Sequence, residues 1–226
     1  MGMKRKAKAG PNYQNHNSIE LKPRNQKQHE YIIQLTDFRK HIVFGIGPAG
    51  TGKTLLAVKA AIKSFKEKEV DKIVITRPVV NVDEDLGFLP GTLEEKMAPW
   101  TRPIFDVFRE HFSNKEIHSM ISESVIEISP LAYMRGRTFK DSYIIADEMQ
   151  NATSNQMKML LTRIGENSKM TVTGDLAQTD RAQDNGLMDF LGKLNSKHSD
   201  YIETIMFDHY DIERHPVVAD VLRIYD

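Results

Sequence analysis

The sequence predicts an α/β fold, with a mainly parallel sheet flanked by helices on both faces. Short apolar runs rich in β-branched residues, such as 41–46, 72–76 and 143–146, are typical of buried strands. Segments with helical spacing, such as 55–65 and 153–164, alternate with these runs. Polar or glycine-rich motifs follow several strands directly, and in such a sheet they gather at the edge where the strands end. A ligand site is therefore expected at that edge.

Composition indicates one large globular domain. The chain has 226 residues, of which 40% are hydrophobic and 27% are charged. It contains no cysteine, which excludes disulfides and thiolate metal sites and makes a reducing cytoplasm the expected location. No apolar run approaches the roughly 20 residues that cross a bilayer, so we expect no membrane association.

The first residues are expected to form a basic, disordered arm over 1–20, followed by a domain over 21–226. Residues 1–40 carry nine Lys or Arg against three acidic residues. Such an arm can contact the phosphates of a nucleic acid. The alternative is a solvated tail that keeps the protein soluble.

A glycine-rich motif of the P-loop type, residues 47–54, follows the strand predicted over 41–46. It fits the spacing G-x-x-x-x-G-K-[ST], and the candidate nucleotide-contacting residues are Gly47, Pro48, Ala49, Gly50, Thr51, Gly52, Lys53, Thr54 and Leu55. Glycines let successive N–H groups turn inward to form an anion site at the start of the next helix. Lys53 supplies a positive charge for the β- and γ-phosphates, and the Thr54 hydroxyl can bind Mg²⁺. The alternative is an ordinary glycine-rich turn between a strand and a helix.

A short helix is predicted over 26–38, directly before the first strand, with Tyr31 and Leu35 on one face. A glutamine amide both donates and accepts hydrogen bonds, so Gln28, or failing that Gln26, could read the edge of adenine. A glutamine that faces solvent is the alternative.

A long segment over 79–112 interrupts the alternation of strands and helices after the strand at 72–76. It contains Trp100 and Arg102, followed by an amphipathic helix predicted over 104–112. Interleaved aromatic and basic residues suit stacking and phosphate contacts with a single nucleic-acid strand. A packed structural lid is the competing interpretation.

The later strands end in polar residues. After a strand over 125–128, the strand at 143–146 ends in Asp147 and Glu148. Asp147 can hold the hydration shell of Mg²⁺, and Glu148 can polarise an attacking water. A helix over 153–164, capped by Thr153 or Ser154, leads to a strand over 169–173, after which Gln178 could sense the γ-phosphate or belong to a simple turn.

These motifs together resemble the PhoH-like ATPases. The matching segments are TGKT at 51–54, TRP at 76–78, LGFLPG at 86–91, RGRTF at 135–139, DEMQN at 147–151, LTRIG at 161–165, TGD at 173–175 with Gln178 and Asp180, and ERHPVV at 213–218. The resemblance covers about 22–226 and implies a RecA-like core similar to that of superfamily 1 helicases. It implies ATP and Mg²⁺ as ligands, RNA or single-stranded nucleic acid as substrate, and RNA helicase activity. Met149 stands where this family more usually has Ala, and little effect is expected.

Two other functions fit parts of the pattern. Thymidine kinases also combine a P-loop with an Asp-Glu strand end, although they usually carry a zinc site built from cysteines, which this chain lacks. A non-enzymatic assembly protein gated by ATP is the other alternative, but Glu148 and Gln178 favour turnover.

The chain has one P-loop and no internal repeat, so we expect no second RecA-like half to supply an arginine to the γ-phosphate. The arginine is then expected either in cis from this domain or in trans from a neighbouring copy, and the second case would build a homo-oligomeric ring, such as a hexamer, with ATP between subunits. Arg137, Arg163 and Arg214 are the candidates for this role, and a surface salt bridge is the alternative for each.

Overall fold

The computed structural model describes residues 19–78, 93–179, 184–213, 217–218 and 224. Its helices are α1 (Gln26–Thr36), α2 (Lys53–Lys66), α3 (Leu93–Arg109), α4 (Asn114–Ser122), α5 (Ser154–Leu161) and α6 (Gly186–Asn195). Its strands are β1 (Ile42–Ile46), β2 (Lys72–Thr76), β3 (Ile126–Ile128), β4 (Ser142–Ala146), β5 (Lys169–Gly174) and β6 (Ile202–Met206). Short 3₁₀ turns are η1 (Leu131–Met134), η2 (Met149–Asn151) and η3 (His209–Asp211). Within these described ranges, no helix is long and apolar enough to span a bilayer.

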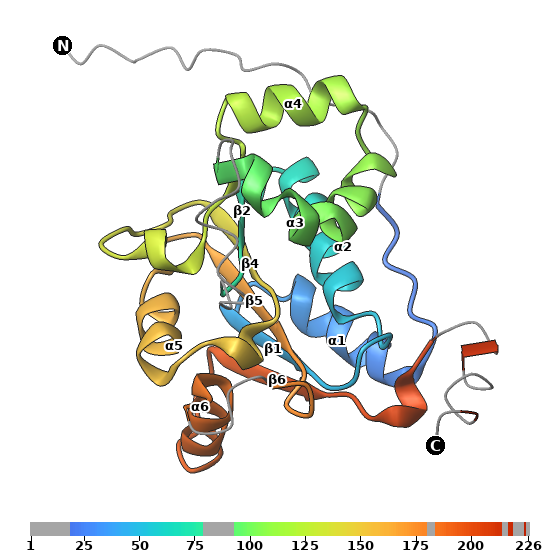
Figure 1. The fold of residues 1–226 in the computed structure, drawn as a ribbon, viewed down its shortest axis with the longest axis vertical. Coiled ribbons are helices and arrows are strands. Elements are labelled where there is room, and N and C mark those ends of the chain that lie inside the picture. The colour runs from blue at the N-terminus through green and yellow to red at the C-terminus, as the bar shows by residue number, and fades with distance from the viewer. Residues whose placement is uncertain (1–18, 79–92, 180–183, 214–216, 219–223, 225–226) are drawn as a thin grey trace.

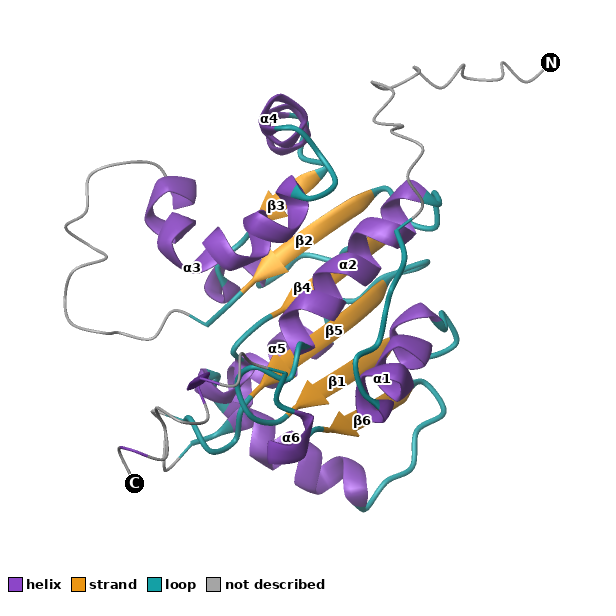
Figure 2. Cartoon of the chain, turned by 90° about the vertical axis from the view of Figure 1, so that its right-hand side faces the viewer, coloured by secondary structure: helices purple, strands orange, loops and turns teal. Residues whose placement is uncertain are grey.

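The strands form one six-stranded sheet in the order β3-β2-β4-β5-β1-β6, and every pairing is parallel. Figure 2 shows all the arrows pointing the same way, so the strands end at one edge. The predicted α/β fold class, with a mainly parallel sheet between two layers of helices, is confirmed. The P-loop and the Asp147-Glu148 pair both lie at this carboxyl edge.

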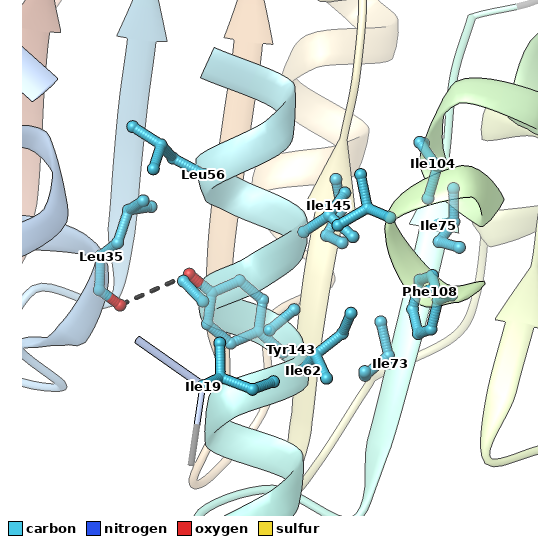
Figure 3. Close-up of a cluster of buried hydrophobic side chains, with 14 of the residues drawn as sticks. Ile19, Leu35, Leu56, Ile62, Ile73, Ile75, Ile104, Phe108, Tyr143 and Ile145 are labelled. Atoms are coloured by element: carbon cyan, nitrogen blue, oxygen red, sulfur yellow. Dashed lines mark hydrogen bonds between the residues drawn. The ribbon is translucent and has the colours of Figure 1, made fainter. Parts of the chain in front are cut away.

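Helices cover both faces of the sheet (Figure 1), and each face packs its own hydrophobic core. Along β4, Tyr143 and Ile145 face α1 to α4 and belong to the first core. Ile144 and Ala146 face α5 and α6 and belong to the second core. Burial on both sides explains why the central strands are mostly apolar. Figure 3 shows the first core, in which the Tyr143 hydroxyl donates to the Leu35 carbonyl at 3.4 Å.

Several boundaries differ from those expected. The helix predicted to begin near residue 104 begins at Leu93 and includes Pro99 and Pro103, residues that usually interrupt a helix. Ile104 and Phe108 are buried in the core shared with α2, so packing holds the helix despite its prolines. The helix predicted over 153–164 ends at Leu161, with Thr153 as its N-cap.

Three elements, α4, α6 and β6, were not predicted from the sequence. The start of α4 carries a local signal, because Ser113 and Glu116 form a capping box. Further along the chain, β6 is an edge strand of mixed burial and therefore lacks the apolar run of the others.

The predicted basic arm lies almost entirely outside the described residues, as does 79–92 of the predicted insertion. Ile19 is only 7% exposed and packs in the first core. The packed part of the chain thus includes residue 19, two residues before the predicted boundary.

Candidate nucleotide-binding site

The P-loop joins β1 to α2 at the carboxyl edge of the sheet. Gly47 has φ of 145°, and a Cβ there would lie 2.3 Å from the Phe207 carbonyl oxygen, so both conformation and space require glycine. Gly52 is the N-cap of α2 with φ of 83°, in the left-handed region. The loop thus presents the N-terminus of α2 at the strand edge, as an anion site requires.

Lys53 lies across this loop and is largely buried. Its ammonium donates to the carbonyl oxygens of Gly47 and Pro48, both at 2.6 Å, and to the Thr51 hydroxyl at 3.3 Å. The cation is thereby held at the P-loop, where an anionic ligand would meet it. Of the remaining candidates on this segment, Leu55 is exposed in the first turn of α2.

Thr54 and Asp147 meet as the metal prediction requires. The Thr54 hydroxyl donates to the Asp147 carboxylate at 2.7 Å, and the Thr173 hydroxyl at the end of β5 donates to the same oxygen. No cluster of three or more His, Cys, Asp or Glu occurs among the described residues. Mg²⁺ is usually held by one or two carboxylates together with substrate phosphates, so this hydroxyl and carboxylate fit it.

Glu148 has left-handed backbone angles, φ 55° and ψ 39°, at the tip of β4. Its carboxylate accepts a hydrogen bond from the Gln150 amide at 2.6 Å. Gln150 is only 1% exposed, and its side-chain oxygen accepts from the Asp175 N–H at 3.2 Å. Through these two hydrogen bonds, the Gln150 side chain links Glu148, the candidate water-activating residue, to the residue that follows β5. From the sequence, Gln150 was only part of a motif and had no role of its own, whereas its neighbour Met149 packs in the second core.

Gln178 lies in the turn that follows β5. Its N–H donates to the Asp175 carbonyl at 3.2 Å, and the Asp175 carboxylate accepts from the Ala177 N–H at 3.0 Å. The Gln178 side chain is exposed at the same edge as the P-loop. Asp180 lies outside the described residues.

Gln28 is buried against the P-loop, so the alternative of a solvent-facing glutamine is wrong. Its amide donates to the Thr51 carbonyl at 3.0 Å and accepts from the Arg24 N–H at 2.9 Å. Each amide atom retains further hydrogen-bonding capacity. Gln26, by contrast, is exposed. The packed face of α1 thus supports the P-loop directly.

A segment to which no element was assigned from the sequence lies against the P-loop. We call residues 207–213 the β6 loop. The Phe207 N–H donates to the Ile46 carbonyl at 2.7 Å, and the Glu213 N–H donates to the Gly50 carbonyl at 2.9 Å. The Asn25 side chain also donates to the Asp211 carbonyl and the Glu213 carboxylate, at 3.3 and 3.2 Å. In the sequence, this loop was indicated by Glu213, which begins a segment that matches the family pattern.

Two of the three candidate arginines lie far from the P-loop of their own chain. Arg137 forms a two-pronged ion pair with Glu127 on β3, four strands from β1, or about 19 Å across the sheet. This pairing lowers the pKa of Glu127, and Arg137 also covers the Phe139 ring. The third candidate, Arg214, lies outside the described residues.

Arg163 lies at the opposite edge of the sheet, in the turn that precedes β5. Its guanidinium donates to the carbonyls of Met159 and Arg137, both at 3.0 Å. Neither Arg137 nor Arg163 therefore contacts the P-loop of its own chain.

Trp100 and Arg102 lie on α3 beside the first core. Trp100 is half-buried and Arg102 is exposed. The following residues Ile104 and Phe108 are fully packed, so this half of the predicted insertion is part of the core. The end of α3 is thus packed against the core, while Arg102 faces solvent.

The chain is similar in sequence to known proteins of one family. The family model described as PhoH-like protein matches residues 20–226. A PhoH-like protein of Bacillus subtilis is 46% identical over 211 residues, covering 92% of this chain and 64% of the relative. Protein PhoH of Escherichia coli is 39% identical over 206 residues, covering 89% of this chain and 57% of the relative. The chain thus spans less than two thirds of the length of these relatives.

Two solved structures are similar to this chain at low sequence identity and low TM-score. The SWI2/SNF2 ATPase core of Sulfolobus solfataricus in complex with dsDNA is 14% identical with a TM-score of 0.47, covering 89% of this chain and 49% of that one. The Pif1 helicase of Candida albicans is 16% identical with a TM-score of 0.42, covering 82% of this chain and 39% of that one. The family match spans nearly the whole domain, and on that ground this chain belongs to the PhoH-like protein family.

Proposed function

We propose that this chain binds ATP with Mg²⁺ and hydrolyses it, and that it couples hydrolysis to the binding or remodelling of RNA or single-stranded nucleic acid. The observation that carries the ATPase proposal is the contact between Thr54 of the P-loop and Asp147 of β4, at 2.7 Å. These residues are 93 positions apart in the sequence. A P-loop hydroxyl beside a carboxylate at a strand end is the arrangement that holds Mg²⁺ in P-loop NTPases.

Each polar group of the site then has one task. Lys53 and the N-terminus of α2 bind the phosphates, since both offer positive charge. Thr54 and Asp147 would hold Mg²⁺, which supplies charge neutralisation on the phosphate oxygens when bound. Glu148 accepts the proton of the water that attacks the γ-phosphate, and ADP and phosphate leave.

Two alternatives remain, and one panel separates them. ATP hydrolysis is measured for the protein alone, then with single-stranded RNA, single-stranded DNA and thymidine. The proposal expects hydrolysis that a nucleic acid stimulates. Phosphorylation of thymidine would identify a nucleoside kinase, and tight ATP binding with no turnover would identify an ATP-gated assembly protein.

Nucleic-acid binding is supported by the exposed Arg102 beside the half-buried Trp100 and by the basic residues 1–40. Aromatic and basic side chains together suit stacking and phosphate contact with single strands. The panel also tests this part: equal ATPase rates with and without every polymer, together with no detectable polymer binding, would remove it.

We propose further that the chain assembles into a ring, such as a hexamer, with ATP between subunits. The support is the distance of Arg137 and Arg163 from the P-loop of their own chain, since an arginine at the γ-phosphate would then come from a neighbour. Arg214 is the third candidate for this contact. Light scattering with a non-hydrolysable ATP analogue across a concentration series tests assembly. A monomer that hydrolyses ATP at every concentration would rule out the ring.

A further inference from the structure

We propose that Tyr210, on the β6 loop, forms the base-binding part of the nucleotide site, with its ring stacked on the purine base of ATP. This inference rests on the proposed function, because it assigns a subsite of the same nucleotide site. It is carried by the strand order, by the anchoring of the loop and by the exposure of the ring.

The strand order fixes the direction in which a nucleotide would lie. Asp147, Glu148 and Thr173 belong to the ends of β4 and β5, on one side of β1, and they define the end of the site that handles the γ-phosphate. On the other side of β1, among the described strands, the only neighbour in the sheet is β6. The base is at the opposite end of the nucleotide from the γ-phosphate. It is therefore expected above β6 and the loop that follows it.

The β6 loop is held against the P-loop at both ends. The Phe207 N–H donates a hydrogen bond to the Ile46 carbonyl at the end of β1, and the Glu213 N–H donates one to the Gly50 carbonyl within the P-loop. Figure 1 shows this loop, in orange-red, beside the start of α1, where the Asn25 side chain also bonds to it. The position of the loop relative to the phosphate site is thus fixed by backbone hydrogen bonds.

Within the loop, two hydrogen bonds from backbone N–H groups to carboxylates hold the backbone around Tyr210. The Asp208 carboxylate accepts from the Tyr210 N–H at 2.8 Å, and the Asp211 carboxylate accepts from the Asp208 N–H at 2.9 Å. This capping box forms the turn η3 and fixes the backbone of Tyr210.

The Tyr210 residue is 83% exposed, the highest value among the exposed large hydrophobic and aromatic residues of the described chain. Its ring contact is with the adjacent His209, at a centroid distance of 3.8 Å. An aromatic face held in water by a rigid turn beside a phosphate site is suited to stacking, because every base offers a π-face and needs no particular hydrogen-bond pattern.

The test compares a ligand that has a base with one that has none. The dissociation constants of a non-hydrolysable ATP analogue and of tripolyphosphate, each with Mg²⁺, are measured by calorimetry for the wild type, Tyr210→Ala and Tyr210→Phe. Tyr201→Ala is the matched control, because Tyr201 is 64% exposed and lies just before β6, at the opposite edge of the sheet.

Tyr210→Ala is expected to weaken binding of the ATP analogue by about five- to 150-fold, the range of stacking on a single base. Its affinity for tripolyphosphate is expected to stay within about twofold of wild type, on the order of experimental error. Tyr210→Phe and Tyr201→Ala should both bind the analogue as the wild type does.

Two results would overturn the inference alone: unchanged analogue binding by Tyr210→Ala, or equal weakening of the analogue and tripolyphosphate, which would mean that the loop only shapes the P-loop. A wild-type protein that binds no ATP analogue at all would instead refute the proposed function, and the subsite with it.

Discussion

Substitution of Gln150 by leucine tests how Glu148 is positioned. Leucine is close in size, but it removes the 2.6 Å hydrogen bond to the Glu148 carboxylate and leaves the Asp175 N–H without its acceptor. A hydrogen bond to a charged group is worth about 1.5–3 kcal/mol. If that energy holds Glu148 in its reactive position, kcat for ATP hydrolysis should fall about ten- to 150-fold. The KM for ATP should change little, because the hydrogen bonds of the Gln150 side chain go to Glu148 and Asp175 and not to the P-loop.

Gln156→Leu is the matched control for this prediction. The Gln156 side chain accepts from the Thr153 N–H at 2.9 Å and caps α5. Its loss should lower the free energy of unfolding by about 0.5–2 kcal/mol while leaving kcat unchanged. Both variants are assayed by steady-state ATPase and by urea unfolding. A Gln150→Leu enzyme with a kcat within about twofold of wild type would refute the positioning argument.

Three further predictions follow from single residues or segments. Lys53→Ala should lose ATP binding or turnover, whereas Glu148→Gln should bind ATP without hydrolysing it; a wild-type rate in the second variant would show that Glu148 is not the base. Lys169 is buried, which lowers its pKa to about 7, although it donates to two backbone carbonyls. The unfolded chain keeps this proton up to the ordinary lysine pKa of 10.5, so the free energy of unfolding should rise by up to about 1.4 kcal/mol per pH unit between those two pKa values, and urea unfolding of Lys169→Met should lack that rise. Deletion of residues 1–9 should weaken nucleic-acid binding and make the affinity depend less steeply on salt concentration. If the slope of affinity against salt is unchanged in a salt titration, the nucleic acid must instead contact the segment around Trp100 and Arg102.

The elements at the centre of the sheet could be predicted because they carry strong local signals. The strand at 72–76 was predicted with its observed bounds, since apolar β-branched residues buried on both faces leave a continuous pattern. Several peripheral elements, β6 and the first half of α3 among them, were not predicted. β6 is half-exposed, and α3 contains two prolines that only its packing against α2 makes acceptable.

The sequence by itself determined which residues make up the candidate phosphate site. The spacing from Gly47 to Thr54 and the Asp147-Glu148 pair after a strand define groups whose tasks follow from charge and backbone geometry alone. The parallel sheet then had to bring Thr54 and Asp147 to one edge, because parallel strands all end at the same edge of the sheet.

Only the tertiary structure decided which other residues join that site. Gln150 bonds to Glu148 because η2 turns its side chain back toward the strand end, and the β6 loop, which carries Tyr210, is hydrogen-bonded to the P-loop because β6 pairs with β1. Neither fact follows from local periodicity, which reports burial and not strand order. Conversely, Arg137 and Arg163 share family motifs with the site but lie far from it in the same chain, since motif membership fixes residue type and not distance.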